Sequence, residues 1–369
     1  MSPDALLVKN GLVVTNNAQL MSSVLIKNGR IEDIGDGNLG TGNGDTQVLD
    51  ASNCYVTPGL IDLQVNGSPK CNLWADPSEA ELIELRRQML ECGVTSFLPT
   101  LITDDIEHLN KNISFLNANG VGEDVDHSNK KDLARMPGIH LEGPFLSSKR
   151  PGVHPPEHIK ALSLSNVKKV DLKKISLMTV ASETDPSGEA LKWLMQQKIV
   201  LSLGHSDADL SQAQRAFAQG VKLVTHLFNA MPPLHHRSPG AVGATFLDDN
   251  VTACIIADGL HLSPDAVKLI FKIKGPDKII LVTDIASVGT KDGGLVGSSI
   301  TLDQAVLNMV TWQVCDFATA IKMASYNPAQ AVHLDSVGSI AKNMLADVLI
   351  WDKSTLKLKY KILGGNLLA

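Results

Sequence analysis

Eight short apolar runs alternate with amphipathic stretches between Gly59 and residue 283. The runs lie near 60–65, 94–100, 138–142, 176–182, 199–204, 222–226, 251–257 and 279–283. Stretches between them, such as 78–91, 207–219 and 263–272, repeat apolar residues at helical spacing, and several begin with a Ser or Asp that can cap a helix. Strands that alternate with helices favour a parallel sheet. Eight such units predict a (β/α)8 TIM-like barrel in the α/β class.

The two ends of the chain have a different pattern. Short β-like runs between glycine-rich turns occur at 6–14, 23–26, 30–34, 48–49 and 55–59, and again at 337–340, 346–351 and 358–363. We therefore expect residues 1–57 and 337–369 to build one small β-sandwich domain beside a barrel of residues 58–336. The polar segment 117–136 is expected to be a surface loop.

Composition limits the classes of function. The chain has 369 residues and a formal net charge of −6, so it offers no basic surface for nucleic acid. No apolar stretch reaches ~18 residues, so no membrane span is expected. Five Cys residues without a CxxC pair indicate reduced thiols and a cytoplasmic protein.

Four polar residues each end a predicted strand: Glu142, His205, His226 and Asp284. Because the C-terminal ends of barrel strands meet at one face, we expect these side chains to lie together. A carboxylate and two imidazoles with a position left open for water are typical of a hydrolytic metal centre, and Asp284 is the candidate general base. A single His or Asp after a strand is more often a core or capping residue, so the prediction depends on all four occurring together.

The residues lie in motifs that resemble a known family. These motifs are PGLID at 58–62, HLEGPF at 140–145, GHS at 204–206, THLFNAM at 225–231, ADGLH at 257–261 and VTD at 282–284. They resemble the amidohydrolase superfamily and, within it, the N-acetylglucosamine-6-phosphate deacetylase family, over almost the whole chain. The resemblance implies hydrolysis of the acetamide of N-acetyl-D-glucosamine 6-phosphate to D-glucosamine 6-phosphate and acetate.

The same resemblance implies that Glu142, His205 and His226 bind the metal, with Zn²⁺ expected first and Fe²⁺, Co²⁺ or Mn²⁺ as alternatives. Gln64 and Asn66 stand where most superfamily members have two His ligands. Because neutral amides are poor ligands for a borderline-soft cation, we expect one divalent metal per chain.

Further roles come from the resemblance alone. His154 is expected to polarise the substrate carbonyl and to contact the substrate, while Asn229, Ala230 and His261 hold the sugar phosphate. Arg237 is expected to reach the phosphate in a neighbouring subunit, which implies a homodimer. An arginine suits this task because its fork matches phosphate oxygens. His235 and His236 receive no role.

The segment 285–298, after Asp284, is shorter than in the family, so a hairpin at the active-site mouth is expected to be missing. Three functions therefore stay open: the sugar-phosphate deacetylase, another amidohydrolase acting on a cyclic amide or N-acyl amino acid, and a sugar-phosphate-binding homologue with weakened catalysis. Asn229, Ala230 and Arg237 argue against the second, and turnover separates the first from the third.

Overall fold

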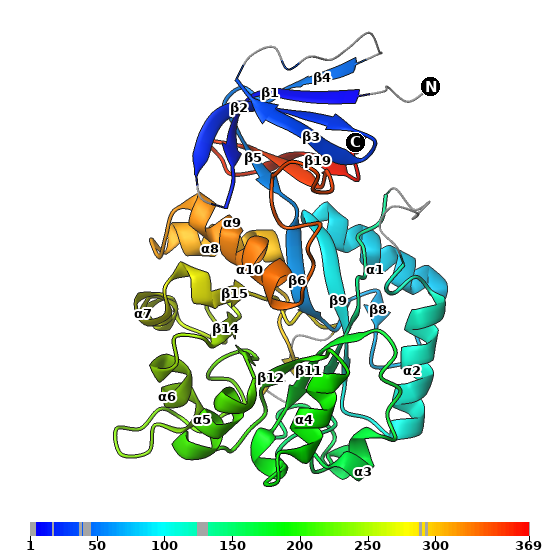
Figure 1. Cartoon of the computed structure of the whole chain (residues 1–369), viewed down its shortest axis with the longest axis vertical. Coiled ribbons are helices and arrows are strands. Elements are labelled where there is room, and N and C mark those ends of the chain that lie inside the picture. The colour runs from blue at the N-terminus through cyan, green and yellow to red at the C-terminus, as the bar shows by residue number, and fades with distance from the viewer. Residues whose placement is uncertain are drawn as a thin grey trace.

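A parallel β-barrel surrounded by helices makes up most of the molecule (Figure 1). The computed structural model describes residues 5–16, 18–36, 39, 46–123, 132–287, 290–291 and 294–368. The barrel strands are β6 (Leu60–Val65), β9 (Val94–Ile102), β10 (Ile139–Glu142), β11 (Ile175–Val180), β12 (Val200–Leu203), β13 (Leu223–Val224), β14 (Thr252–Ile255) and β15 (Ile279–Leu281). The eight predicted strands and the barrel are thus confirmed.

Helices cover the outside of the barrel. They are α1 (Glu79–Glu91), α2 (Ile106–Ala118), α3 (Leu164–Val167), α4 (Glu189–Gln196), α5 (Leu210–Gln219), α6 (Gly240–Leu247), α7 (Pro264–Lys274), α8 (Leu302–Thr311), α9 (Phe317–Ala324) and α10 (Tyr326–Ala331), with 3-10 turns at Pro156–His158, Ser182–Thr184 and Pro276–Lys278. Ser78 forms a capping box on α1, where the sequence predicts the cap, whereas α5 begins two residues later than predicted and has Asp209 rather than Asp207 as its cap. None of the helices in the described ranges is long and apolar enough to cross a bilayer.

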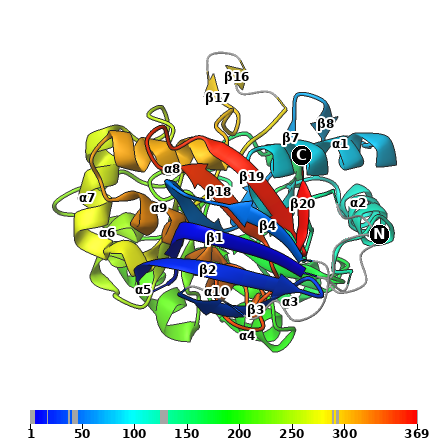
Figure 2. The same cartoon turned by 90° about the horizontal axis from the view of Figure 1, so that it is seen from above.

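Both ends of the chain contribute to one eight-stranded sheet, which lies over one end of the barrel (Figures 1 and 2). Its strands are β1 (Ala5–Val14), β2 (Gln19–Lys27), β3 (Arg30–Gly35), β4 (Thr46–Asp50), β5 (Cys54–Pro58), β18 (Val348–Asp352), β19 (Leu358–Leu363) and β20 (Asn366–Leu368). The antiparallel pair β5–β18 joins the two ends, with Val56 opposite Ile350 in a core that is separate from that of the barrel. The domain boundaries given above stay a prediction.

Two expectations from the sequence are wrong, one for a strand and one for a loop. Residues 337–340 are not a strand, because Gly338 has φ +82 and lies so close to helix α10 that a Cβ would meet that of Ala329 at 2.7 Å. Of the polar segment 117–136, residues 124–131 lie outside the described part of the chain. Leu133, Ala134 and Met136 are buried rather than part of a surface loop, because the backbone at residue 135 bonds to strand β9.

The shortened segment after Asp284 still forms a hairpin, contrary to expectation. Strands β16 (Thr290–Lys291) and β17 (Gly294–Leu295) pair antiparallel, and Figure 2 shows them projecting from the edge of the barrel. The segment is closed at its base, where Ala286 N–H donates to the Ser298 carbonyl at 3.1 Å. A few residues suffice for this hairpin because its ladder is only two residues long.

A buried carboxylate closes the barrel between its first and last strands. The Thr283 hydroxyl donates to Asp62 Oδ2 at 2.6 Å. The backbone N–H groups of Gln64 and Thr283 donate to Asp62 Oδ1 at 3.1 and 3.3 Å. Burial raises the pKa of Asp62 to about 6, and these hydrogen bonds oppose that rise. One backbone bond also crosses the gap, from Asn66 N–H to the Ile285 carbonyl at 2.8 Å. This contact between the first and last strands, the seam of the barrel, therefore depends on side-chain hydrogen bonds as much as on backbone pairing.

Thr283→Val should destabilise the fold by about 1–3 kcal/mol, because it removes a donor from a fully buried carboxylate. Urea unfolding followed by circular dichroism measures the change. Thr311→Val, at the exposed C-terminal end of α8, is the matched control and should change the free energy of unfolding by less than about 0.5 kcal/mol. Equal effects of the two substitutions would contradict a special role for the seam.

Candidate active site

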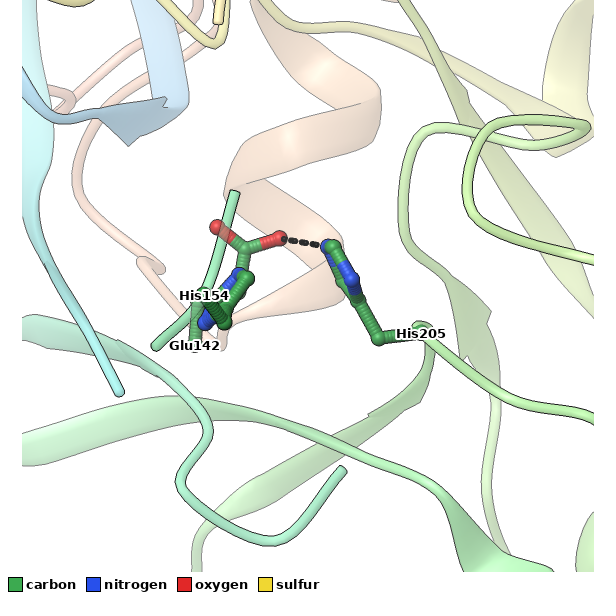
Figure 3. A group of neighbouring side chains, drawn as sticks. All are labelled: Glu142, His154 and His205. Carbon is green, nitrogen blue, oxygen red and sulfur yellow. Dashed lines mark ion pairs between the residues drawn. The ribbon is translucent and has the colours of Figure 1, made fainter. Parts of the chain in front are cut away.

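Three ligand-type atoms meet where strands β10, β12 and β13 end. Glu142 Oε1 lies 3.0 Å from His226 Nε2 and 3.3 Å from His205 Nε2, and the two imidazole nitrogens are 3.1 Å apart. Figure 3 shows the carboxylate of Glu142 facing His205, with His154 beside it. Glu142, His205 and His226 are each no more than 4% exposed. Three ligand atoms this close together can coordinate a single metal cation.

The protein fixes the tautomer of one imidazole. His205 Nδ1 lies 3.0 Å from the Arg150 carbonyl, which can only accept a hydrogen bond. The proton is therefore on Nδ1, and the lone pair of Nε2 faces Glu142 and His226. A metal-ligating histidine is usually held in this way by a carbonyl on its other nitrogen. His226 Nδ1 is buried and has no hydrogen-bond partner in the described part of the chain.

The charges of the cluster agree with this arrangement. Although burial alone would raise the pKa of Glu142, the imidazoles of His205 and His226 beside its carboxylate hold it well below its usual range. Burial lowers the pKa of His226, but the hydrogen bond and charge of Glu142 outweigh it, so the pKa of His226 is raised. The cluster therefore holds an ionised carboxylate that attracts positive charge, which fits a divalent cation.

His154 lies on the loop after β10 and is 2% exposed. The backbone N–H of Thr103 donates to its Nδ1 at 3.2 Å, and the Thr103 hydroxyl lies 2.8 Å from the same nitrogen. Because Nδ1 accepts a backbone proton, the ring carries its own proton on Nε2. Burial and the neighbouring His205 keep the pKa of His154 well below its usual range, so the ring is neutral. It can offer an N–H donor to the site.

Asp284 follows β15 and is 9% exposed. Asn66 Nδ2 donates to its Oδ1 at 2.7 Å, and the Trp74 indole donates to Asn66 Oδ1 at 3.3 Å. Burial and the charge of Glu142 raise the pKa of Asp284 to about 7. A carboxyl group in this range can both take up and release a proton. Gln64 is also buried, and its Nε2 has no partner among the described residues.

The backbone at these strand ends is strained. His205, His226 and Asp284 have φ of 47°, 30° and 53°, in the left-handed region that residues other than Gly seldom adopt. Each such residue costs about 1–3 kcal/mol and persists only where the surroundings hold it. At Asp284, the Ser298 N–H bonds to the carbonyl oxygen at 2.7 Å. The left-handed conformation directs these side chains towards one another at the mouth of the barrel.

The other expected substrate-binding residues lie on the segments that follow strands β13 and β14. Asn229 and Ala230 are half-buried on the turn after His226, and Asn229 Nδ2 donates to the His226 carbonyl at 3.1 Å. His261 Nδ1 pairs with Asp258 Oδ2 at 2.7 Å. Arg237 lies on an exposed loop, and it has no ion-pair partner in the described chain.

The sequence reasoning missed residues that hold the chemical groups in place. Four of them hydrogen-bond directly to a predicted site residue: Trp74 to Asn66, Thr103 to His154, Arg150 to His205 and Asp258 to His261. The fifth is Glu183, whose carboxylate accepts hydrogen bonds from the Ser206 hydroxyl at 2.7 Å and the backbone N–H of Asp207 at 2.6 Å, next to His205 in the chain. Only Asp258 and Ser206 lie within a motif named above. Thr103, Arg150 and Glu183 lie 51, 55 and 23 residues from their partners, and Trp74 lies outside any motif, so no local pattern marks them.

Comparison with known proteins places these features in a family. The model of the amidohydrolase family matches residues 55–367. N-acetylglucosamine-6-phosphate deacetylase of Lysinibacillus sphaericus is 31% identical over 378 residues, with 95% of each chain covered. The crystal structure of the Pasteurella multocida deacetylase has a TM-score of 0.88 and 28% identity, covering 99% of this chain and 100% of its own. A Mycobacterium smegmatis deacetylase mutant, solved in complex with N-acetyl-D-glucosamine-6-phosphate, has a TM-score of 0.83 and 26% identity, covering 100% of this chain and 99% of its own.

Gly152→Ala should weaken binding of a divalent metal by about 10–100-fold, the range seen when support of a ligand is disturbed. A Cβ at this position would lie 2.9 Å from His205 Cε1 and 3.4 Å from Nδ1, so the ring must move. Calorimetric titration with Zn²⁺ measures the affinity.

Gly188→Ala is the matched control for this substitution. Gly188 also has a positive φ, +72, but its Cβ would meet only the flexible end of Gln219. Both variants should lose about 1–2 kcal/mol of stability through backbone strain, whereas only Gly152→Ala should lose metal affinity. Unchanged affinity in Gly152→Ala would show that the position of His205 does not matter for the metal.

Proposed function

Because this chain belongs to the amidohydrolase family, we propose that it catalyses the metal-dependent hydrolysis of the acetamide of N-acetyl-D-glucosamine 6-phosphate, giving D-glucosamine 6-phosphate and acetate. The observation that carries the proposal is the meeting of Glu142, His205 and His226 within 3.3 Å beside the buried carboxylate of Asp284. Deacetylases that match this chain over nearly their whole length support the choice of substrate.

We assign the metal to Glu142, His205 and His226, with one Zn²⁺ per chain. Glu142, His154 and His205 also have ligand atoms within 4.8 Å of one another. However, the ring nitrogen of His154 that accepts from Thr103 is occupied, and the other carries a proton, so neither offers a lone pair. His226 has no such restriction. Gln64 and Asn66 are amides where a second cation would need stronger ligands, which supports a single ion.

The chemistry divides between the cation and the side chains. A divalent cation at this site supplies Lewis-acid polarisation of the acetamide carbonyl and lowers the pKa of water. Asp284 takes the proton from the attacking water and returns it to the sugar nitrogen as the C–N bond breaks. His154 donates Nε2–H to the carbonyl oxygen as negative charge develops there. Acetate and the free amine are the products.

The remaining roles concern the substrate and the assembly. We propose that Asn229, Ala230 and His261 contact the sugar phosphate, and that Arg237 reaches the phosphate bound in the partner subunit of a homodimer. The exposure of Arg237 supports this, because its side chain is available to another molecule. A cytoplasmic location is also proposed, supported by five cysteines that are all unpaired.

Neither alternative function is favoured. A cyclic amide or an N-acyl amino acid needs no phosphate contact, and the relatives that match nearly the whole chain are sugar-phosphate deacetylases. Loss of catalysis is not favoured either, because the short segment after Asp284 keeps its hairpin and its base is closed by hydrogen bonds.

An acetate-release assay on N-acetyl-D-glucosamine 6-phosphate tests the proposal, with the unphosphorylated sugar beside it. Turnover of the phosphate ester, with elemental analysis giving about one divalent metal per chain, is the expected result. Substrate binding without acetate release would favour the catalytically weakened homologue. Two tightly bound ions per chain would refute the single-metal assignment.

Asp284→Asn should keep the metal and lose at least ~10²-fold in kcat, because an amide cannot accept the proton of the attacking water. Acetate release and metal content are measured on the same sample. Asp277→Asn is the matched control, since it changes an exposed carboxylate that pairs with Lys322 rather than one beside the metal ligands. Near-normal turnover of Asp284→Asn would remove this residue from the mechanism.

Arg237→Ala should chiefly raise KM for the phosphorylated sugar, because it removes a charge-assisted contact far from the reacting bond. The penalty should shrink for the sugar without phosphate. A mixed dimer of one Arg237→Ala subunit and one Asp284→Asn subunit then tests the crossing. If Arg237 crosses, the only site with Asp284 receives the intact arginine of its partner and should have a wild-type KM at half the sites, whereas a high KM would mean that Arg237 acts within its own subunit.

A further inference from the structure

The side-chain amide of Asn66 bridges an indole and a carboxylate, and the indole decides its orientation. An indole N–H can only donate, so the 3.3 Å contact of Trp74 Nε1 requires the oxygen of the amide on that side. The amide N–H₂ then faces Asp284 Oδ1 at 2.7 Å. In the reverse orientation, two donors would face each other at Trp74, and an oxygen would face the carboxylate at Asp284. Trp74 thus makes Asn66 a donor to Asp284.

The backbone around Asn66 allows little adjustment. Asn66 N–H donates to the Ile285 carbonyl at 2.8 Å, its own carbonyl accepts from Leu73 N–H at 3.2 Å, and the residue is 1% exposed. Two short strands, β7 (Gly67–Ser68) and β8 (Cys71–Asn72), connect this point to Trp74. The Trp74 amide is fixed by Asn72 Oδ1 at 3.0 Å. Hydrogen bonds to their backbone groups therefore hold both Asn66 and Trp74 in place.

Asp284 depends on this donor. Within the described ranges, Asn66 is the only side chain that hydrogen-bonds to its carboxylate, and the contact is to Oδ1 alone. The carboxylate is buried on a backbone in the left-handed region, so the contact sets the rotation of the group at a point where the main chain is already strained. The second oxygen, Oδ2, is left without a protein donor in this part of the chain.

We propose that Trp74 is a positioning residue for the reaction, acting through Asn66 to hold Asp284 Oδ1 so that Oδ2 exchanges the proton. The inference rests on the proposed function, because it gives Asp284 the role of base. It also assigns a use to the amide at position 66, where a metal ligand is expected in most of the superfamily. In this chain the amide serves the base instead of a second cation.

Trp74→Phe removes the N–H and keeps an aromatic ring. We expect kcat to fall about tenfold, the size of one lost hydrogen bond between neutral groups, with KM and metal content unchanged. Trp193→Phe is the matched control: it removes a half-buried indole on helix α4, where Lys168 is the neighbouring cation, and should leave kcat unchanged. A normal kcat in Trp74→Phe, or a loss of metal, would overturn the proposal.

A double-mutant cycle distinguishes action through Asn66 from a general effect of the indole. Asn66→Leu keeps the shape of the side chain and removes both polar groups. In this background Trp74→Phe should have no further effect on kcat, whereas an undiminished tenfold loss would mean that Trp74 acts by another route.

The indole ¹H–¹⁵N resonance of Trp74, assigned by its absence in Trp74→Phe, gives a readout that needs no turnover. It should shift in Asn66→Leu, because the acceptor is gone, and an unchanged resonance would overturn the contact itself. If the wild-type protein released no acetate, the proposed function would fail, while this resonance would still report on the indole–amide contact. The two failures can therefore be told apart.

Discussion

The buried carboxylate of Asp62 holds together the part of the barrel on which the site depends. Strands β6 and β15 are the first and last of the sheet, and regular backbone pairing does not run along their common edge. The hydrogen bonds from Thr283 to Asp62 bring these strands together. Because Asn66 follows β6 and Asp284 follows β15, the same closure brings the amide and the carboxylate within 2.7 Å. The Asp62–Thr283 contact, which stabilises the fold, and the Asn66–Asp284 contact, which belongs to the site, thus lie next to each other on the same two strands.

The floor of the site is polar and fully hydrogen-bonded across the barrel. Burial lowers the pKa of His140 to about 4, so its ring is neutral, and its nitrogens bond to the Leu63 carbonyl at 3.0 Å and the Thr179 hydroxyl at 2.8 Å. The chain continues from Thr179 to Thr225 at 2.7 Å and to Ser202 at 2.6 Å. Such a network is stable only when every member has a partner. It links strands β10, β11, β12 and β13 directly beneath the candidate ligands.

Strand periodicity and strand-end chemistry predicted the eight barrel strands and the group of Glu142, His205, His226 and Asp284. Both signals are local, because a strand and the residue after it are neighbours in the chain. The partners of those residues could not be predicted in this way. Thr103 bonds to His154 across 51 residues, and Arg150 bonds to His205 across 55, so each contact exists only after the barrel has closed. The error at 337–340 has a similar origin, since a close approach to α10 decides the conformation of Gly338.

The left-handed backbone at His205, His226 and Asp284 limits which residue types can replace them, as well as where their side chains point. Asn, Asp and His enter this region far more readily than β-branched side chains, for which it is an outlier. Variation at the three positions is therefore filtered by conformation before any selection for catalysis acts. An aspartate, an asparagine or a second histidine can appear there without remodelling the turn, whereas a valine, isoleucine or threonine cannot. The barrel mouth can thus exchange one polar chemistry for another more easily than it can become apolar.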